Sequence, residues 1–238
     1  MNPLRYSKQL SVSYTLGASL TIELLQTKPQ LLKHIYVHTD TERNDTYWLI
    51  AKMCTRYQIP MSQNNKAFNI LSNKENVYYI GEFTKFRSNL EASANHVVLV
   101  NPANAGNLGT IIRTMVGFNM FNLAIITPSV DLFDPKVVRA SMGSFFHLQF
   151  ALFTSFQDYL KAFSHHPYCF MLKGKNALSQ LVLKQPYALV FGNEASGLSD
   201  DFLEVGESIK INHSSLIDSL NLPMAVGIAL YETTKNNF

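Results

Sequence analysis

Short apolar segments alternate with helical patterns from Val97 to the C-terminal end of the chain. The apolar segments lie at 97–100, 122–127, 148–152, 168–172, 187–192 and 208–211. The helical patterns lie at 108–118, 135–144, 156–163 and 220–233. Strands that are apolar on both faces are typical of a parallel sheet covered by helices on each side. The alternation predicts an α/β fold, in which ligands collect where loops leave the carboxyl ends of the strands.

The first part of the chain predicts a separate and smaller α/β unit. Its predicted elements are helices at 18–26 and 46–60 and strands at 35–38 and 77–83. A polar segment that carries several Ser and Asn residues then leads to Val97. We therefore expect a domain boundary near residue 90, with one domain at 1–90 and a second at 96–238.

The composition of the 238 residues, 47% of them hydrophobic, supplies a substantial core. The chain has no run of eighteen apolar residues and its N-terminus lacks the apolar stretch of a secretory signal, so we expect a cytoplasmic protein without a membrane partner. Cys54 and Cys169 form no metal-ligand or CxxC pattern, which predicts reduced thiols. His165 and His166 are adjacent and therefore point apart, so no metal site is predicted.

The net charge of +3 is unevenly distributed along the chain. Residues 1–95 hold 11 Lys and Arg against 7 Asp and Glu, a balance of +4, whereas residues 96–238 hold 9 against 10. A basic first domain suits a partner that bears phosphates, because each neutralised phosphate releases counterions. An ordinary solvated surface would explain the same charges.

The segment "NPANAGNLGTIIRT" at 101–114 is the first of three junctions rich in Asn, Gly and Ser. Gly106 and Gly109 allow close approach to the backbone, and the following helix carries Arg113. The segment matches neither GxGxxG nor the phosphate-binding P-loop. A capped helix with Arg113 in a surface ion pair is the alternative interpretation.

The second junction, "VFGNEASGLSD" at 190–200, places Glu194 between Gly192 and Gly197 after an apolar strand. Glu194 could accept hydrogen bonds from a substrate or a basic partner, or it could cap a helix that begins near Ser199. The third junction lies at 211–232, where Ser219 and Asn221 precede the last helix. An ordinary N-cap at Ser219 is the alternative there.

In this order, "NLGTIIR", "FGNEASG" and "SLNLPMAVGIALYE" resemble the three motifs of the SpoU (TrmH-like) family of RNA 2′-O-ribose methyltransferases in the SPOUT class. The resemblance covers residues 96–236 and includes "VRASMGSFFHL" at 138–148. It implies a C-terminal SPOUT domain with a deep trefoil knot, S-adenosylmethionine held in the knotted loops, and a homodimer with active sites completed across the interface.

The resemblance also assigns the site residues. The expected catalytic residues are Asn107, Arg113, Glu194, Ser219 and Asn221, and the expected cofactor-binding residues are Gly192, Ile211 and Leu220. Arg113 would act at the ribose hydroxyl as base or as the group that stabilises the alkoxide, positioned by Glu194 and Asn107. Ser219 and Asn221 would orient the ligand and the loop. We therefore expect Arg113 to be the basic partner of Glu194.

The predicted function is methyl transfer from S-adenosylmethionine to a ribose 2′-hydroxyl of structured RNA, either rRNA or tRNA. Residues 1–90 resemble the accessory RNA-binding domain of such enzymes only loosely. Candidate phosphate contacts there are Lys28, Lys33, Arg43, Lys52 and Arg56, while Trp48 is predicted to belong to the core. Two alternatives stay open: a catalytically silent RNA-binding relative that acts in RNA or ribosome assembly, and an unrelated α/β enzyme that binds a nucleotide.

Overall fold

The computed structural model describes residues 3–72 and 76–237, which form two compact units. Unit 1 consists of residues 1–86 together with residues 131–147. Unit 2 consists of residues 87–130 and 148–238. The first change of unit falls close to the boundary expected near residue 90.

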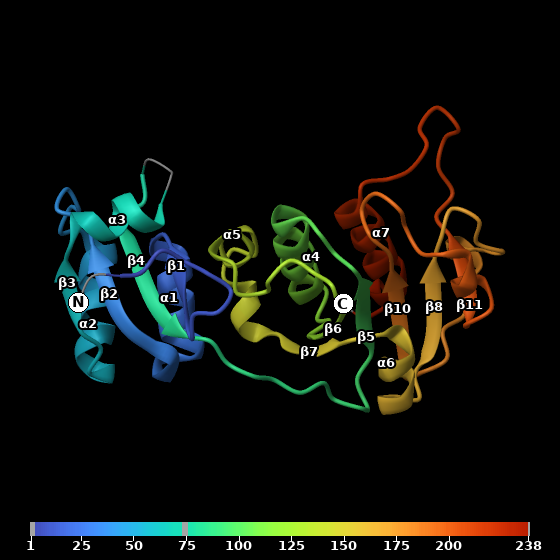
Figure 1. The fold of residues 1–238 in the computed structure, drawn as a ribbon, viewed down its shortest axis with the longest axis horizontal. Helices are drawn as coiled ribbons and strands as arrows, with labels where there is room; N and C mark the ends of the chain where they lie inside the picture. Colours follow the sequence, from blue (N-terminus) through green and yellow to red (C-terminus); the bar gives the residue numbers. More distant parts are fainter. Residues whose placement is uncertain (1–2, 73–75, 238) are drawn as a thin grey trace. The chain divides into compact units, whose positions relative to one another are not determined.

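Unit 2 is built on a seven-stranded sheet (Figure 1). Its strands are β5 (His96–Val100), β6 (Asn122–Ile126), β7 (Gln149–Phe153), β8 (His166–Phe170), β9 (Asn176–Ala177), β10 (Tyr187–Phe191) and β11 (Glu207–Lys210). Their order in space is β7-β6-β5-β10-β8-β11-β9, and every neighbouring pair is parallel. The predicted α/β class with a mostly parallel sheet is confirmed. The trefoil knot stays a prediction.

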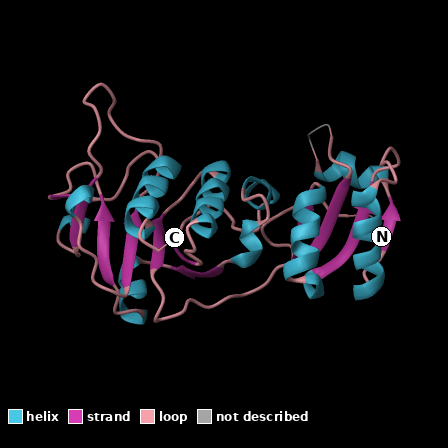
Figure 2. Ribbon diagram, turned by 180° about the vertical axis from the view of Figure 1, so that it is seen from behind, coloured by secondary structure: helices cyan, strands magenta, loops and turns pink. Residues whose placement is uncertain are grey.

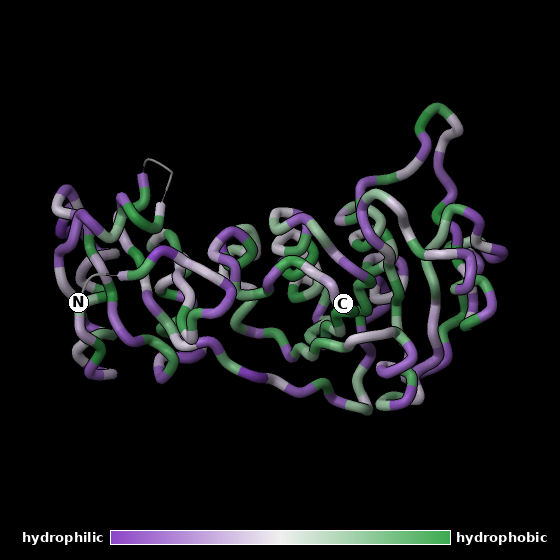
Figure 3. Tube along the Cα trace, in the orientation of Figure 1, coloured by the Kyte–Doolittle hydropathy of each residue, from purple (hydrophilic) through white to green (hydrophobic). Residues whose placement is uncertain are grey.

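The central strands of this sheet are hydrophobic along almost their whole length, as Figure 3 shows for β5, β6 and β10. Val97, Val98 and Leu99 of β5 are fully buried, and so are Leu189 and Val190 of β10. Burial on both faces requires apolar side chains at consecutive positions. This requirement is why uninterrupted apolar runs located the strands in the sequence.

The helices of unit 2 are α4 (Ala105–Gly117), α6 (Phe156–Ala162) and α7 (Leu222–Thr234). Helices α4 and α7 lie side by side (Figure 2). A Cβ atom added to Gly227 would lie 3.7 Å from the Thr114 methyl carbon, an ordinary van der Waals distance, so Gly227 faces α4 but an alanine would also fit there.

Unit 1 contains a four-stranded sheet in the order β1-β4-β2-β3. Its elements are β1 (Val12–Leu16), α1 (Ala18–Thr27), β2 (Leu32–Val37), α2 (Asp45–Tyr57), β3 (Met61–Gln63), α3 (Asn65–Leu71), β4 (Tyr79–Thr84) and α5 (Pro135–Ala140). Strand β4 is antiparallel to both β1 and β2, whereas β2 and β3 are parallel. Strands β1 and β3 and helix α3 were not predicted from the sequence.

Residues 131–147 belong to unit 1, although the sequence assigned them to the second domain. The physical reason is an aromatic cluster. The ring of Phe133 lies 5.4 Å from that of Phe86, and the ring of Phe146 lies 5.4 Å from that of Phe83. Phe145 contacts both Phe86 and Phe133. Linear sequence order did not indicate that these rings would pack together.

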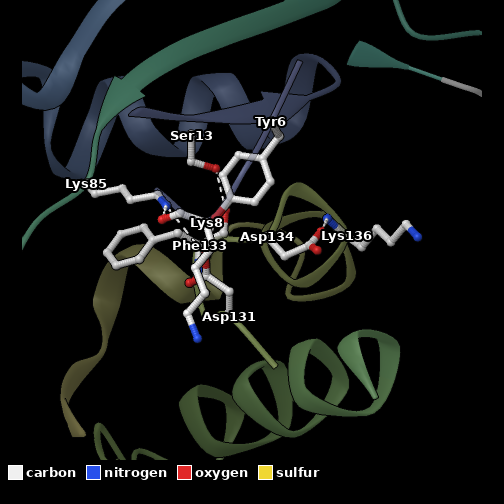
Figure 4. Close-up of polar contacts among 8 residues, drawn as sticks. All are labelled: Tyr6, Lys8, Ser13, Lys85, Asp131, Phe133, Asp134 and Lys136. Carbon is white, nitrogen blue, oxygen red and sulfur yellow. Dashed lines mark hydrogen bonds and ion pairs between the residues drawn. The ribbon is translucent and has the colours of Figure 1, made fainter. Parts of the chain in front are cut away.

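Polar contacts also hold the start of this segment in unit 1 (Figure 4). The Asp131 carboxylate accepts a hydrogen bond from the Tyr6 hydroxyl and lies 3.5 Å from the Lys85 ammonium group. The Ser13 hydroxyl donates to the Phe133 carbonyl oxygen. The Lys85 nitrogen lies 4.7 Å from the centre of the Tyr6 ring, which adds a cation–π contact. Residues distant in sequence thus share one network.

A buried histidine lies at the start of β5 in unit 2. His96 is fully buried, and its ring stacks on that of His165 at 4.0 Å. Its Nε2 lies 2.9 Å from the Glu91 carbonyl oxygen and its Nδ1 lies 2.9 Å from the Tyr159 hydroxyl. A carbonyl oxygen can only accept, so Nε2 donates and Nδ1 of the neutral ring accepts from Tyr159.

We expect His96 to make the protein less stable in mild acid. Burial lowers the pKa of His96 to about 4, with a smaller contribution from His165, against an opposing hydrogen bond to Glu91. The unfolded chain therefore binds a proton more readily, so the free energy of unfolding should fall by up to about 3 kcal/mol between pH 6.5 and pH 4. Chemical denaturation across this range should show a shallower decline for His96→Gln, and equal slopes would contradict the assignment.

Both cysteines, Cys54 and Cys169, are buried and free, which confirms the predicted reduced thiols. Within the described part of the chain, every helix is too short or too polar to cross a membrane.

Candidate active site

The three polar junctions meet at one edge of the sheet in unit 2. The first follows β5, the second follows β10 and the third follows β11. Because β5, β10, β8 and β11 are linked by parallel pairings, their carboxyl ends share that edge. Figure 1 shows the third junction, between β11 and α7, extending away from the body of the sheet.

Glu194 joins the second junction to the first. Its Oε2 accepts a hydrogen bond from the Ala103 backbone N–H at 3.0 Å, and its Oε1 accepts one from the Asn104 N–H at 3.0 Å. The Asn107 side-chain amide donates to the same Oε1 at 3.3 Å. One carboxylate therefore holds the entrance of α4 against the loop that follows β10. Glu194 and Asn107 were both predicted to position Arg113, whereas their direct contact was not predicted.

The expected ion pair between Glu194 and Arg113 is not formed, and that prediction is wrong for this structure. No ion pair of Arg113 is found among the described residues, and its side chain is exposed on α4. Arg113 lies six residues beyond Asn107, which is about 9 Å along the helix axis and about 120° around it. The hydrogen-bond donors of Glu194 are backbone and amide N–H groups instead.

These donors decide the charge of Glu194. Partial burial raises the pKa of its carboxyl group, but the hydrogen bonds from Ala103, Asn104 and Asn107 outweigh that effect. The pKa of Glu194 therefore lies below its ordinary value. Its contribution to stability is present at neutral pH and is lost as the pH falls through the lowered pKa.

We expect Glu194→Gln to destabilise unit 2 by about 1–3 kcal/mol. A glutamine has one acceptor oxygen, so its NH₂ group would face either the Ala103 or the Asn104 N–H, and a donor would lose its partner. Chemical denaturation measures the change. Glu204→Gln is the matched control, because Glu204 is an exposed acid paired with Lys175. Equal stability of the two variants would contradict the clamping role of Glu194.

Asn193 shapes the loop around Glu194 and was missed by the sequence prediction. Its Oδ1 accepts from the Ala195 N–H at 2.9 Å, and its Nδ2 donates to the Asn101 carbonyl oxygen at 2.8 Å. The Gly197 N–H donates to the Asn193 carbonyl oxygen at 2.9 Å, which closes the turn. The sequence feature that could have indicated this role is the position of Asn193 directly before the predicted Glu194.

A cavity of about 330 Å³ opens between the second and third junctions. It is lined by residues of 170–173, 191–198 and 209–225. The predicted residues that line it are Gly192, Glu194, Ile211, Ser219 and Leu220. At this cavity the rings of Phe170 and Phe191 stack in parallel at 4.5 Å. Its volume falls within the range of small-molecule sites, which is about 300–1,000 Å³.

Three predicted site residues lie outside this lining. Asn107 reaches the cavity only through its contact with Glu194, and Arg113 lies further along α4. Asn221 is the N-cap residue of α7, but its side chain makes no capping hydrogen bond. The alternative interpretation of Ser219 as the N-cap does not hold, because the N-cap lies two residues later, and the exposed Ser219 lines the cavity.

A known protein family matches the part of the chain that forms this site. The profile described as the SpoU rRNA Methylase family matches residues 94–231, a range that contains all three junctions. The chain belongs to the SpoU rRNA Methylase family. Among solved SpoU-like folds, the AdoMet-bound rRNA methyltransferase from Sinorhizobium meliloti is similar with a TM-score of 0.80. It is 24% identical, and the match covers 96% of this chain and 88% of that chain. This similarity shows a shared fold.

Two curated relatives of the chain are named as 23S rRNA 2′-O-methyltransferases. The guanosine(2553) enzyme RlmP of Bacillus subtilis is 26% identical over 219 residues, which cover 90% of this chain and 85% of that protein. The adenosine(1067) enzyme of Streptomyces laurentii is 30% identical over 158 residues, which cover 63% of this chain and 58% of that protein. The chain spans little more than half the length of some of the curated relatives that it matches.

Proposed function

We propose that this chain transfers a methyl group from S-adenosylmethionine to a ribose 2′-hydroxyl of RNA. The observation that carries the proposal is that two of the SpoU motif segments line one cavity, and that Glu194 joins one of these two to the third segment. Relatives that are named as rRNA 2′-O-methyltransferases support the reaction class.

The cavity fits S-adenosylmethionine in size and chemistry. Its walls combine apolar side chains, including Ile211 and Leu220, with the polar groups of a turn at 192–198. We infer that Gly192, Ile211 and Leu220 hold the cofactor. The similar Sinorhizobium meliloti protein was crystallised with AdoMet bound. When bound, the cofactor supplies an electrophilic sulfonium methyl group.

The residues of the chain would prepare the ribose hydroxyl for attack. Arg113 would lie near this oxygen and stabilise the negative charge that develops as its proton leaves. A guanidinium group offers hydrogen-bond donors and no acceptor, so stabilising the developing charge suits it better than removing a proton. Glu194 and Asn107 would fix the entrance of α4, the helix that carries Arg113. Ser219 and Asn221 would orient the ligand at the start of α7.

We infer that the RNA is ribosomal or transfer RNA, and that unit 1 contributes to binding it. The positive balance of the first 95 residues supports a phosphate-bearing partner. The candidate phosphate contacts Lys28, Lys33, Arg43, Lys52 and Arg56 all belong to unit 1. A cytoplasmic location and the absence of a bound metal stay predictions.

We infer further that two copies of the chain associate through α7. Its exposed apolar side chains are Met224 (60% exposed), Ile228 (38%) and Tyr231 (58%). Residues spaced by three and four positions share one helix face, so the three form a continuous row. An exposed apolar row of this kind favours a protein–protein contact.

Ile228→Asp is expected to convert such a dimer into monomers, because the association would bury an unpaired charge. Sedimentation velocity reports the change in mass. Val182→Asp is the matched control, since Val182 is also apolar and is 81% exposed elsewhere in unit 2. A wild-type protein that sediments as a monomer at all concentrations would refute the inference.

The reaction is tested by transfer of labelled methyl from S-adenosylmethionine to total RNA. RNA from cells that lack this protein should accept the label, because its target hydroxyl is unmodified. RNA from cells that contain the protein should accept little. Cofactor binding without incorporation into either RNA would overturn the proposed activity and favour the catalytically silent relative that acts in RNA or ribosome assembly.

A further inference from the structure

Helix α2 of unit 1 presents the only tryptophan of the chain to solvent. Trp48 is 57% exposed, so its predicted place in the core is wrong. The reason lies in the helix itself. Ile50 and Cys54, one turn apart, are the buried residues of α2, and Trp48 precedes them on the outer side. An indole this exposed contributes little to the core packing that stabilises this helix.

Two cations follow Trp48 along the same outer face. Lys52 and Arg56 lie four and eight positions after Trp48, a spacing that places all three in one row. Both side chains are exposed, and no ion pair of either is found in the described part of the chain. The acid of α2, Asp45, is its first residue, where a negative charge stabilises the helix dipole.

Neighbouring aromatic residues support the row. The Tyr47 ring meets the Trp48 ring edge to face at 5.2 Å, which limits the motion of the indole. The Arg56 guanidinium lies 5.4 Å from the centre of the Tyr57 ring. Exposed planar rings beside unpaired cations form the combination that binds unpaired nucleotides, through base stacking and phosphate contacts.

We propose that the outer face of α2, defined by Trp48, Lys52 and Arg56, docks an unpaired segment of RNA. Trp48 stacks on a base, while Lys52 and Arg56 contact phosphates of the same strand. The choice of RNA as partner rests on the proposed function. The charge favours RNA over a second copy of the chain, because two such faces would bring like charges together.

The sole tryptophan makes the contact directly observable. A base that stacks on indole quenches its fluorescence, so a hairpin RNA with an unpaired loop should quench Trp48 in a saturable and salt-dependent manner. The same sequence as a fully paired duplex should quench it much less. Trp48→Ala should weaken hairpin binding, measured with a labelled RNA, by roughly fivefold to 100-fold. Trp48→Phe should recover most of the affinity, because a ring is retained.

The charged part of the face has its own test. Lys52→Gln and Arg56→Gln should each lower the slope of log affinity against log salt by about 0.7, the value for one phosphate of a single strand. Lys66→Gln is the matched control, since Lys66 is exposed on α3 of the same unit. Leu49→Ala controls for the loss of an exposed apolar side chain from α2.

The hairpin could bind without changing Trp48 fluorescence, and Trp48→Ala could bind it with wild-type affinity. These two results together would overturn the docking surface and leave the proposed methyl transfer unaffected. Fluorescence that changes with protein concentration in the absence of RNA would also overturn it, in favour of self-association through this face. If the hairpin quenches Trp48 but no RNA is methylated, the docking surface would be supported. Only the proposed activity would then be contradicted.

Discussion

Replacing Arg113 by alanine is expected to lower the rate of RNA methylation by about 100-fold to 1,000-fold, the usual effect of removing one group that stabilises a developing negative charge. The affinity for S-adenosylmethionine should stay within about twofold, because Arg113 does not line the cavity. Single-turnover kinetics measures the first quantity and calorimetry measures the second.

Two further variants sharpen this prediction. Arg113→Lys keeps the positive charge but loses the planar set of donors, so a partial recovery of the rate would show how much of the effect depends on charge alone. Arg87→Ala removes an exposed arginine of unit 2 that lies outside the candidate site, and it should methylate RNA at the wild-type rate. Unchanged turnover in Arg113→Ala would exclude Arg113 from the chemistry.

The second large effect is expected from Gly192→Ala. A Cβ atom at this position would lie 2.1 Å from the Gly197 carbonyl carbon and 2.3 Å from the Leu198 nitrogen. These atoms belong to the backbone, so the turn at 192–198 would have to move. Because this turn lines the cavity, we expect at least a tenfold loss of affinity for S-adenosylmethionine and a loss of about 3 kcal/mol in stability.

Gly117→Ala is the matched control for the glycine substitution. Gly117 is the last residue of α4, and an added Cβ would meet no atom within 4 Å. Its stability and cofactor affinity should equal those of the wild type or slightly exceed them. If Gly192→Ala bound S-adenosylmethionine with wild-type affinity, the cofactor would not depend on the close approach of this turn.

The parallel sheet could be predicted from sequence because burial on both faces requires local apolar runs. The segment 187–192 contains β10, and 97–100 lies within β5. Strand β3 has only three residues and no buried one, so it gave no such signal. The place of 131–147 in unit 1 depends on contacts with residues such as Phe83 and Tyr6, which lie far away in sequence.

The sequence predicted which residues belong to the candidate site, but it did not predict which groups form hydrogen bonds with one another. The motif resemblance assigned Glu194, Ser219, Leu220 and Ile211, all of which line one cavity. The hydrogen bonds of Glu194 to backbone N–H groups were missed, because sequence patterns identify side chains and a backbone donor looks the same at every residue. Trp48 was misplaced because apolar character alone does not show which side of α2 faces solvent.

Mass spectrometry of nucleosides from methylated RNA distinguishes methyl transfer to the 2′-oxygen of ribose from transfer to a base. RNA from cells lacking the protein is incubated with S-adenosylmethionine and either the wild-type protein or Arg113→Ala, then digested completely. A 2′-O-methyl nucleoside should appear with the wild type and not with the variant. A methyl group found on a base, or equal methylation by both proteins, would contradict this expectation.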